Sequence, residues 1–330
     1  MARQGAQSRT ATVVFLGMDS VYSARVLAAV IERGHRVQAA FKPMAGLETR
    51  RRNVMTRSTY MPGVANRAIS HFTHALPQID RNEADPFHVA ALHGCPCYTV
   101  GSASSERALE LVRKLAPDVI AIAFFNQLLK PSLLAVPRLG TLNAHPSLLP
   151  GYRGPAPLFW MLRNGEERGG VTLHLVDDGE DTGAILYREE TPIPLGITGP
   201  ELLDKLSDIA ARLMVRAIDD LVAGTARGEP QQAAAATRHA RPGEADLQIT
   251  FDQPAARVFG VVRGLAQWAP LWAEIDGERV RLLDATTYDA TAQLGADLVL
   301  SGDEVAVQCQ PGVVILKTRR PLPTAQPVVR

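Results

Sequence analysis

The chain has 330 residues, 46% of them hydrophobic and 21% charged, and its formal net charge is +1 at pH 7. This length predicts two domains rather than one small core. The near balance of charges gives no general argument for nucleic-acid or membrane binding, although it leaves room for a local basic patch. No run of 18 apolar residues occurs, so no transmembrane helix is expected.

The polar start of the chain, residues 1–10, lacks the apolar segment of a secretory signal and is expected to be a frayed tail. The three cysteines are Cys95, Cys97 and Cys309. The spacing of Cys95 and Cys97 suits neither a redox pair nor a zinc site, so we expect reduced, partly buried thiols in a cytoplasmic protein.

The first predicted elements are a buried strand over residues 12–16, a helix over 23–32 and a second strand over 36–41. Asp19 or Ser20 can cap the helix. This β-α-β start lacks the G-x-G-x-x-G sequence of dinucleotide-binding folds, which counts against a nicotinamide-dependent enzyme.

Residues 43–86 are harder to assign, and their front part is basic, with arginines at 50–52 and at 57. These arginines indicate either a solvated surface segment or a binding site for an anionic substrate. His71 and His74 are three residues apart, but no third ligand lies at a spacing that would suit a metal.

From residue 86 the pattern is regular again. Helices are predicted over 87–92, 105–115, 127–134, 157–164 and 202–223, and strands over 97–100, 118–125 and 171–175. Alternating helices and strands predict a mostly parallel, doubly wound α/β sheet covered on both faces. We place this first domain at residues 1–225.

Residues 226–246 are rich in Gly, Pro, Gln and Ala and are predicted to be a linker. Beyond it, a domain over 247–330 is expected, with a helix from 254 to 265 and strands over 247–251, 271–275, 279–285, 305–308 and 313–318. Short strands separated by turn residues predict a smaller β-rich, barrel-like domain.

The chemistry-bearing residues cluster after the strand at 118–125. Asn143 and His145 are two residues apart, so both side chains point to the same side of an extended strand end. Pro146 and Pro150 then break regular structure, and ligands bind where such strands open into loops. Asp181 lies between Gly179 and Gly183, which allow a tight turn.

These three residue types suit acyl transfer: an amide to stabilise an oxyanion, an imidazole to carry a proton, and a carboxylate to orient the imidazole. The residues alone leave an alternative open, in which Asn143 and His145 bond to the loop backbone and Asp181 caps a turn. His174, on a predicted strand, is expected to be a packed or surface histidine.

Three motifs follow in order: N-x-H-P-S-L-L-P from Asn143, R-G at Arg153, and D-x-G-x-D-T-G from Asp177. In this order and spacing they resemble the 10-formyltetrahydrofolate-dependent formyltransferases. The resemblance begins at Val13 and extends to about residue 215. It continues more weakly over 247–317, which is similar to the C-terminal domain of the methionyl-tRNA formyltransferases.

The resemblance implies a formyltransferase-like fold with catalytic Asn143, His145 and Asp181, and 10-formyltetrahydrofolate as co-substrate without a metal. It places folate-binding and substrate-binding residues around this set. Those implied for folate are Phe125, Gln127, Leu128, Asp177 and Gly179, and those for the substrate are Ser147 and Arg153. Arg153 could instead make an internal ion pair, and Asp177 could anchor its loop.

The amino group of methionyl-tRNA is the acceptor that the resemblance favours, with initiator tRNA as partner. One departure counts against it: the family's basic loop P-D-R-P-x-G-R-G is replaced here by K-P-M-A-G-L-E-T-R-R-R-N over 42–53. A small amine, such as an amino-sugar nucleotide or a specialised metabolite, and a hydrolase using water therefore remain alternatives. A tRNA enzyme would need its basic residues on one face. The candidates beyond 50–52 are Arg257, Arg263, Arg279, Arg281, Lys317, Arg319 and Arg320.

Overall fold

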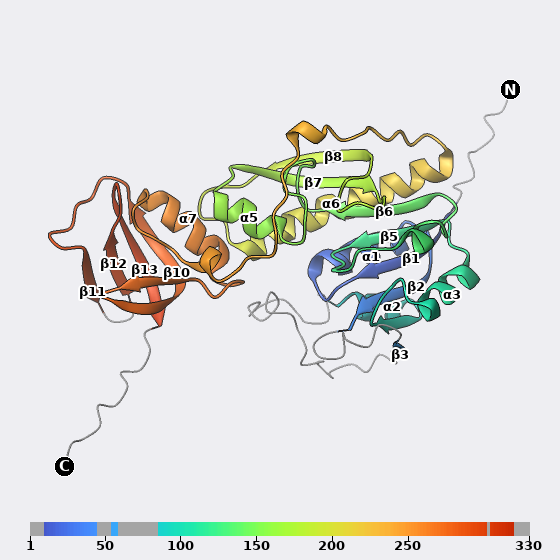
Figure 1. The fold of residues 1–330 in the computed structure, drawn as a ribbon, viewed down its shortest axis with the longest axis horizontal. Helices are drawn as coiled ribbons and strands as arrows, with labels where there is room; N and C mark the ends of the chain where they lie inside the picture. The colour runs from blue at the N-terminus through green and yellow to red at the C-terminus, as the bar shows by residue number, and fades with distance from the viewer. Residues whose placement is uncertain (1–9, 45–53, 59–84, 302–303, 320–330) are drawn as a thin grey trace, which may run out of the picture.

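The computed structural model describes residues 10–44, 54–58, 85–301 and 304–319, and Figure 1 shows the path of the chain. It begins with β1 (Thr12–Gly17), α1 (Val21–Glu32) and β2 (Arg36–Pro43), as the sequence predicts. Ser20 caps α1, because its side chain accepts a hydrogen bond from the Ser23 N–H. β1 and β2 pair in parallel, so α1 is the crossover between them.

Eight strands form the main sheet in the order β3-β4-β2-β1-β5-β6-β7-β8. The further strands are β3 (Met55–Ser58), β4 (Cys97–Val100), β5 (Val119–Ala123), β6 (Gly140–His145), β7 (Arg168–Leu175) and β8 (Ile185–Pro192). The strands from β4 to β6 pair in parallel, whereas β3 at one edge and β7 and β8 at the other pair antiparallel. The prediction of a mostly parallel sheet is confirmed, and the direction of the strands reverses after β6.

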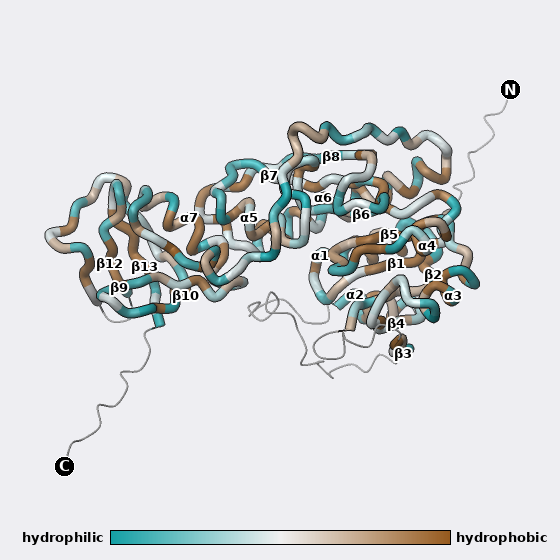
Figure 2. Tube along the Cα trace, in the orientation of Figure 1, coloured by the Kyte–Doolittle hydropathy of each residue, from teal (hydrophilic) through white to brown (hydrophobic). Residues whose placement is uncertain are grey.

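Helices cover both faces of the main sheet, because alternate residues of its buried strands point to opposite faces. On the face that holds Val13 and Phe15 lie α1, α2 (Pro86–Leu92), α5 (Pro157–Asn164) and α6 (Gly199–Ala223). On the face of Val14 and Leu16 lie α3 (Glu106–Leu115) and α4 (Pro131–Leu134). Figure 2 shows hydrophobic residues along β1 and β5 in the middle of this sheet. The doubly wound arrangement is confirmed.

A second sheet has the strand order β11-β12-β13-β10-β9, and its pairs are antiparallel. Its strands are β9 (Trp272–Ile275), β10 (Glu278–Asp289), β11 (Leu298–Ser301), β12 (Glu304–Gln308) and β13 (Val313–Arg319). α7 (Ala255–Leu265) packs against β10 and β13. Figure 1 shows this curled sheet at one end of the molecule, apart from the main sheet. The prediction of a smaller β-rich, barrel-like part is confirmed.

Two predicted elements are wrong. Instead of a strand over 247–251 there is a short 3-10 turn, η3 (Ala245–Leu247), and Gln248 makes only an isolated bridge to Trp272. The helix predicted over 127–134 is confined to α4, because Pro131 disfavours helical geometry in the residue before it. The sequence patterns also fail to predict β3, β8 and β11.

The stretch over 226–246 is docked on the main sheet, and Figure 1 shows it running back past β8 toward α7. Glu229 pairs with Ile185 at the start of β8, and Arg238 makes a bridge to Arg153. A 3-10 turn, η2 (Ala233–Ala235), lies between these two contacts.

Among the described residues, no helix is both long and apolar enough to cross a membrane.

Candidate active site

The carboxyl end of β6 carries Asn143 and His145 at the point where the sheet changes direction. β6 runs parallel to β5 but antiparallel to β7. In the antiparallel register Asn143 lies opposite His174, and His145 lies opposite Thr172. Directly opposite residues project to the same face and interact. β7 therefore places His174 beside the predicted pair.

Asp181 joins this cluster from the loop that follows β7. Its Oδ1 atom lies 3.5 Å from His145 Nδ1 and 3.4 Å from Asn143 Nδ2. His174 Nε2 is 3.7 Å from the same oxygen. The other oxygen, Oδ2, accepts a hydrogen bond from the Gly154 N–H at 2.9 Å. The structure thus brings the three predicted catalytic side chains together.

Both nitrogens of the His145 imidazole face hydrogen-bond acceptors. The ring is buried, and its Nε2 lies 2.9 Å from the carbonyl oxygen of Tyr152. A carbonyl can only accept, so Nε2 donates there. Nδ1 faces the Asp181 carboxylate, which likewise accepts when ionised. The contact of Nδ1 with Asp181, at 3.5 Å, is the longer of the two, so Nδ1 is the ring nitrogen that is held less tightly.

Asn143 is oriented by His174. His174 Nδ1 lies 2.8 Å from the Leu175 carbonyl oxygen, so Nδ1 carries the proton and Nε2 keeps a lone pair. That lone pair accepts from Asn143 Nδ2 at 3.1 Å. The second N–H of Asn143 points toward Asp181 at the longer distance of 3.4 Å. This weaker contact leaves one N–H available to a substrate oxygen.

Of the two predicted substrate-binding side chains, Ser147 is fully buried, and its hydroxyl donates to the Gly151 carbonyl oxygen at 2.8 Å. The Arg153 guanidinium donates to Gln231 Oε1, at 2.7 Å from one of its nitrogens. Both side chains therefore shape the loop over 147–154. A substrate contact for either one stays a prediction.

The predicted folate-binding residues lie in two loops. After β5, Phe125 is half-buried, and the Leu128 side chain is 70% exposed. The Gln127 amide accepts from the Ala103 N–H at 2.8 Å and donates to the Gly101 carbonyl at 3.2 Å, so it fixes a neighbouring loop.

In the loop after β7, Asp177 Oδ1 accepts from the Gly179 N–H at 3.2 Å and from Thr182 Oγ1 at 2.6 Å. Asp177 is thus a loop anchor, one of the two roles that the sequence allows. A Cβ atom at Gly179 would lie 2.0 Å from Thr182 Oγ1, so this turn admits no larger residue without movement. Folate contacts of Asp177 and Gly179 stay predictions.

Comparison with known proteins places this chain in a family. Residues 69–218 match the formyl transferase family, and residues 243–323 match the formyl transferase C-terminal domain. A methionyl-tRNA formyltransferase of Pelobacter propionicus is 30% identical over 306 residues, covering 93% of this chain and 87% of the relative. The chain belongs to the formyltransferase family. Another methionyl-tRNA formyltransferase, from Syntrophus aciditrophicus, is 36% identical over 211 residues, which are 63% of this chain and 68% of the relative.

Solved structures show that the fold of this formyltransferase is shared. The sugar 3N-formyltransferase WlaRD superposes with a TM-score of 0.65 at 14% identity, covering 95% of this chain and 100% of that one. An N-formyltransferase of Helicobacter canadensis gives 0.64 at 16% identity, covering 92% and 98%. Both were crystallised with formylated folates. At this identity the two structures show that the fold is shared, whereas transfer of a formyl group follows from membership of the family.

His174 should make the stability of this formyltransferase depend on pH. Burial lowers the pKa of His174 to about 4 from an ordinary value of 6.5; Asp181 opposes the shift, and His145 adds to it. A lowered pKa means that the unfolded chain binds the proton more readily between pH 4 and 6.5. The free energy of unfolding should therefore fall by on the order of 3 kcal/mol as pH drops through this window.

Urea unfolding at pH 7, 6, 5 and 4 measures this loss. His174→Gln should reduce the dependence of the free energy of unfolding on pH in this window, whatever its effect on stability at pH 7. His93→Gln, at an exposed position, should keep the full slope. Equal slopes for all three proteins would contradict the prediction.

Residues of the linker, whose composition predicts only a connection, pack against the site. The Arg153 N–H donates to the Thr237 carbonyl at 2.9 Å, and the His239 N–H donates to the Arg153 carbonyl at 3.0 Å. The His239 ring stacks on Tyr152, the residue whose carbonyl faces His145, at a centroid distance of 4.9 Å. A low-complexity stretch carries no periodic signal from which such docking could be predicted.

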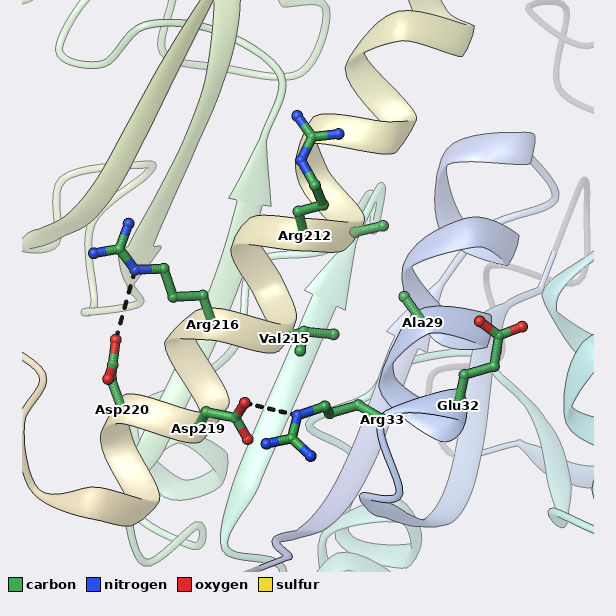
Figure 3. A pocket seen from close by; sticks show the side chains of 9 residues that line it. Ala29, Glu32, Arg33, Arg212, Val215, Arg216, Asp219 and Asp220 are labelled. Atoms are coloured by element: carbon green, nitrogen blue, oxygen red, sulfur yellow. Dashed lines mark hydrogen bonds and ion pairs between the residues drawn. The ribbon is translucent and has the colours of Figure 1, made fainter. Parts of the chain in front are cut away.

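A groove between α1 and α6 holds a different set of side chains (Figure 3). Arg33 and Asp219 pair across it at 2.8 Å, and Arg216 pairs with Asp220 at 3.7 Å. Arg33 caps the carboxyl end of α1, and α1 runs antiparallel to β1 and β2. The groove therefore lies at the amino ends of the parallel strands, whereas His145 lies at the carboxyl end of β6. The three arginines that line it are each paired with a carboxylate of the protein. No cluster of three or more metal-ligating side chains occurs in the described residues.

Proposed function

We propose that this enzyme transfers the formyl group of 10-formyltetrahydrofolate to the amino group of methionyl-tRNA. The observation that carries the proposal is the convergence of Asn143, His145 and Asp181 at the end of β6. It is supported by methionyl-tRNA formyltransferase relatives whose similarity spans both the main sheet and the second sheet.

In the proposed reaction, the acceptor nitrogen attacks the formyl carbon, and the formyl oxygen gains negative charge before the bond to the folate nitrogen breaks. The N–H of Asn143 that makes the longer contact, with Asp181 at 3.4 Å, would turn to stabilise that oxygen. His145 would carry the proton from the attacking nitrogen to the leaving nitrogen through Nδ1, the ring nitrogen with the longer of its two contacts. Asp181 would hold the imidazole and stabilise its charged form, as its 3.5 Å separation from Nδ1 allows.

The loop after β5 would hold the folate ring. Phe124 adopts a left-handed backbone with φ 53°, which turns the chain out of the sheet immediately after β5. The exposed Leu128 and half-buried Phe125 then supply apolar surface at the same edge as Asn143. Phe125, Gln127 and Leu128 would hold the ring, while Asp177 and Gly179 would shape the opposite side.

In this enzyme, residues 1–225 would carry out catalysis, residues 226–246 would connect the two parts, and residues 247–330 would support the acceptor. It places the enzyme in the cytoplasm. The free, buried thiols of Cys95, Cys97 and Cys309 fit a reducing compartment.

One observation favours the second candidate, a formyltransferase for a small amine. Four arginines of the C-terminal part have partners inside the protein. Arg279 pairs with Glu244 at 2.5 Å, Arg263 lies 3.4 Å from Asp284, and Arg281 donates to the Ala269 carbonyl at 3.0 Å. Arg257 donates to the Arg163 carbonyl. Groups already paired have less to offer a phosphate backbone.

At the start of the basic segment, Lys42 is also paired, at 2.5 Å from Asp19 and 3.1 Å from Asp85. The arginines at 50–52, Arg320, His71 and His74 lie outside the described residues. Lys317 and Arg319 are exposed on β13.

The salt dependence of turnover distinguishes the two acceptors. With 10-formyltetrahydrofolate and charged initiator tRNA, kcat/KM should fall at least about 10-fold between 50 and 200 mM salt, because phosphate contacts release counterions. With an amino-sugar nucleotide, turnover should stay near background. The second candidate would replace the first if the small amine were formylated rapidly, with a salt response under about twofold, and the tRNA were not formylated.

A further inference from the structure

Gln231, in the linker, lies between the two loops that complete the active site. One loop, 147–154, carries Arg153 and Gly154. The other, 176–183, carries Asp181. Gln231 is half-buried and lies 50 residues beyond Asp181 in the chain.

The amide of Gln231 is fully engaged with these loops. Its Nε2 donates to the backbone carbonyls of Asp181 and Gly183, at 2.8 Å in each case. Its Oε1 accepts from the Arg153 guanidinium, at 3.2 Å from Nε and 2.7 Å from the second nitrogen. One side chain therefore ties the backbone of the Asp181 turn to the loop that carries Gly154.

The Asp181 turn needs such support. Asp181 has φ 56°, a left-handed conformation that is unfavourable for residues with a side chain and persists only where the surroundings hold it. Gly183, two residues later, packs so closely against β7 that a Cβ atom there would lie 1.8 Å from the Leu175 carbonyl oxygen. Within this turn the Asp181 carboxylate reaches His145 and Asn143 with one oxygen and the Gly154 N–H with the other.

We propose that Gln231 is a positioning residue for formyl transfer, which acts through Asp181 by holding its backbone in the left-handed turn. The linker is then part of the catalytic machinery, because the orientation of the carboxylate depends on a residue outside all three sequence motifs. The inference rests on the proposed catalytic role of Asp181.

Two variants of Gln231 separate positioning from folding. Gln231→Ala removes the whole amide. Gln231→Glu keeps its shape and the acceptor for Arg153 but replaces the two N–H donors by an oxygen that repels the carbonyls. Gln232→Ala and Gln232→Glu are matched controls, since the neighbouring glutamine is exposed and its side chain makes no hydrogen bond in the described structure.

Both Gln231 variants should lower kcat by roughly 10–100-fold, because small displacements of a catalytic group have effects of this size. The KM for 10-formyltetrahydrofolate should stay within about twofold, and the Gln232 variants should match the parent. Crystal structures of the glutamate variants should show the Asp181 carboxylate displaced from His145 only for Gln231→Glu. This comparison needs no knowledge of the acceptor.

A double-mutant cycle tests whether the effect passes through Asp181. In an Asp181→Asn background, Gln231→Ala should cost less than about threefold in kcat, because the group that it positions is already disabled. A full additional loss in that background, or an unmoved carboxylate in Gln231→Glu, would overturn the inference. Normal activity of Asp181→Asn alone would instead refute the proposed catalytic site.

Discussion

Asp181→Asn should lower kcat by on the order of 100-fold or more, with folate binding largely kept. The substitution preserves shape but removes the negative charge that faces His145 Nδ1 at 3.5 Å. Without that charge the imidazole loses its stabilising partner when it takes up a proton. An amide could also turn its NH2 group toward Nδ1 and hold the ring in the wrong tautomer.

Asp178→Asn is the matched control, because Asp178 lies three residues away in the same loop and is exposed. It removes the same charge without touching the cluster and should leave kcat within about twofold. Single-turnover rates with 10-formyltetrahydrofolate and an amine acceptor provide the measurement. Activity of Asp181→Asn equal to that of Asp178→Asn would exclude the assigned role.

A loss of similar size, at least about 100-fold in kcat, is expected for His145→Ala, which removes the proposed proton carrier. His174 cannot take over, although it lies in the same cluster. Burial lowers the pKa of His174 to about 4, and its Nε2 lone pair is used by Asn143. At neutral pH it therefore has no proton to give from the atom that faces the site.

Added imidazole tests the role of His145 directly. It should restore part of the activity of His145→Ala by occupying the vacated space, and it should not stimulate Asp181→Asn. The exposed His93→Ala provides a control for loss of a histidine elsewhere. Retention of more than about half of the parental kcat in His145→Ala would contradict the mechanism.

The parts of the fold that the sequence predicts are those with a local physical signal. The fully buried β5 and the capped α1 follow from apolar runs, period and cap residues that act within a few positions. The strand predicted over 247–251 fails, because pairing with a distant segment decides whether an extended stretch becomes a strand. β8, a largely polar strand at the edge of the sheet, lacks a local signal for the same reason.

The catalytic site divides in the same way. The two-residue spacing of Asn143 and His145 and the glycines around Asp181 draw attention to the three side chains, and the resemblance to the formyltransferases assigns them to catalysis. The contribution of His174 depends on the antiparallel register between β6 and β7, which places it opposite Asn143. Burial there makes this histidine neutral, and no sequence pattern reports that environment.

By itself, the sequence determines which chemical groups the chain contains. It also determines which short segments can form turns or extended strands, since these local preferences depend on neighbouring residues. Only the tertiary structure decides that Gln231 reaches the Asp181 turn and that Arg153 bonds to a glutamine rather than a carboxylate. Those contacts join residues 50 to 78 positions apart. Their geometry follows from packing of the whole sheet, its loops and the linker, and not from any local preference of the chain.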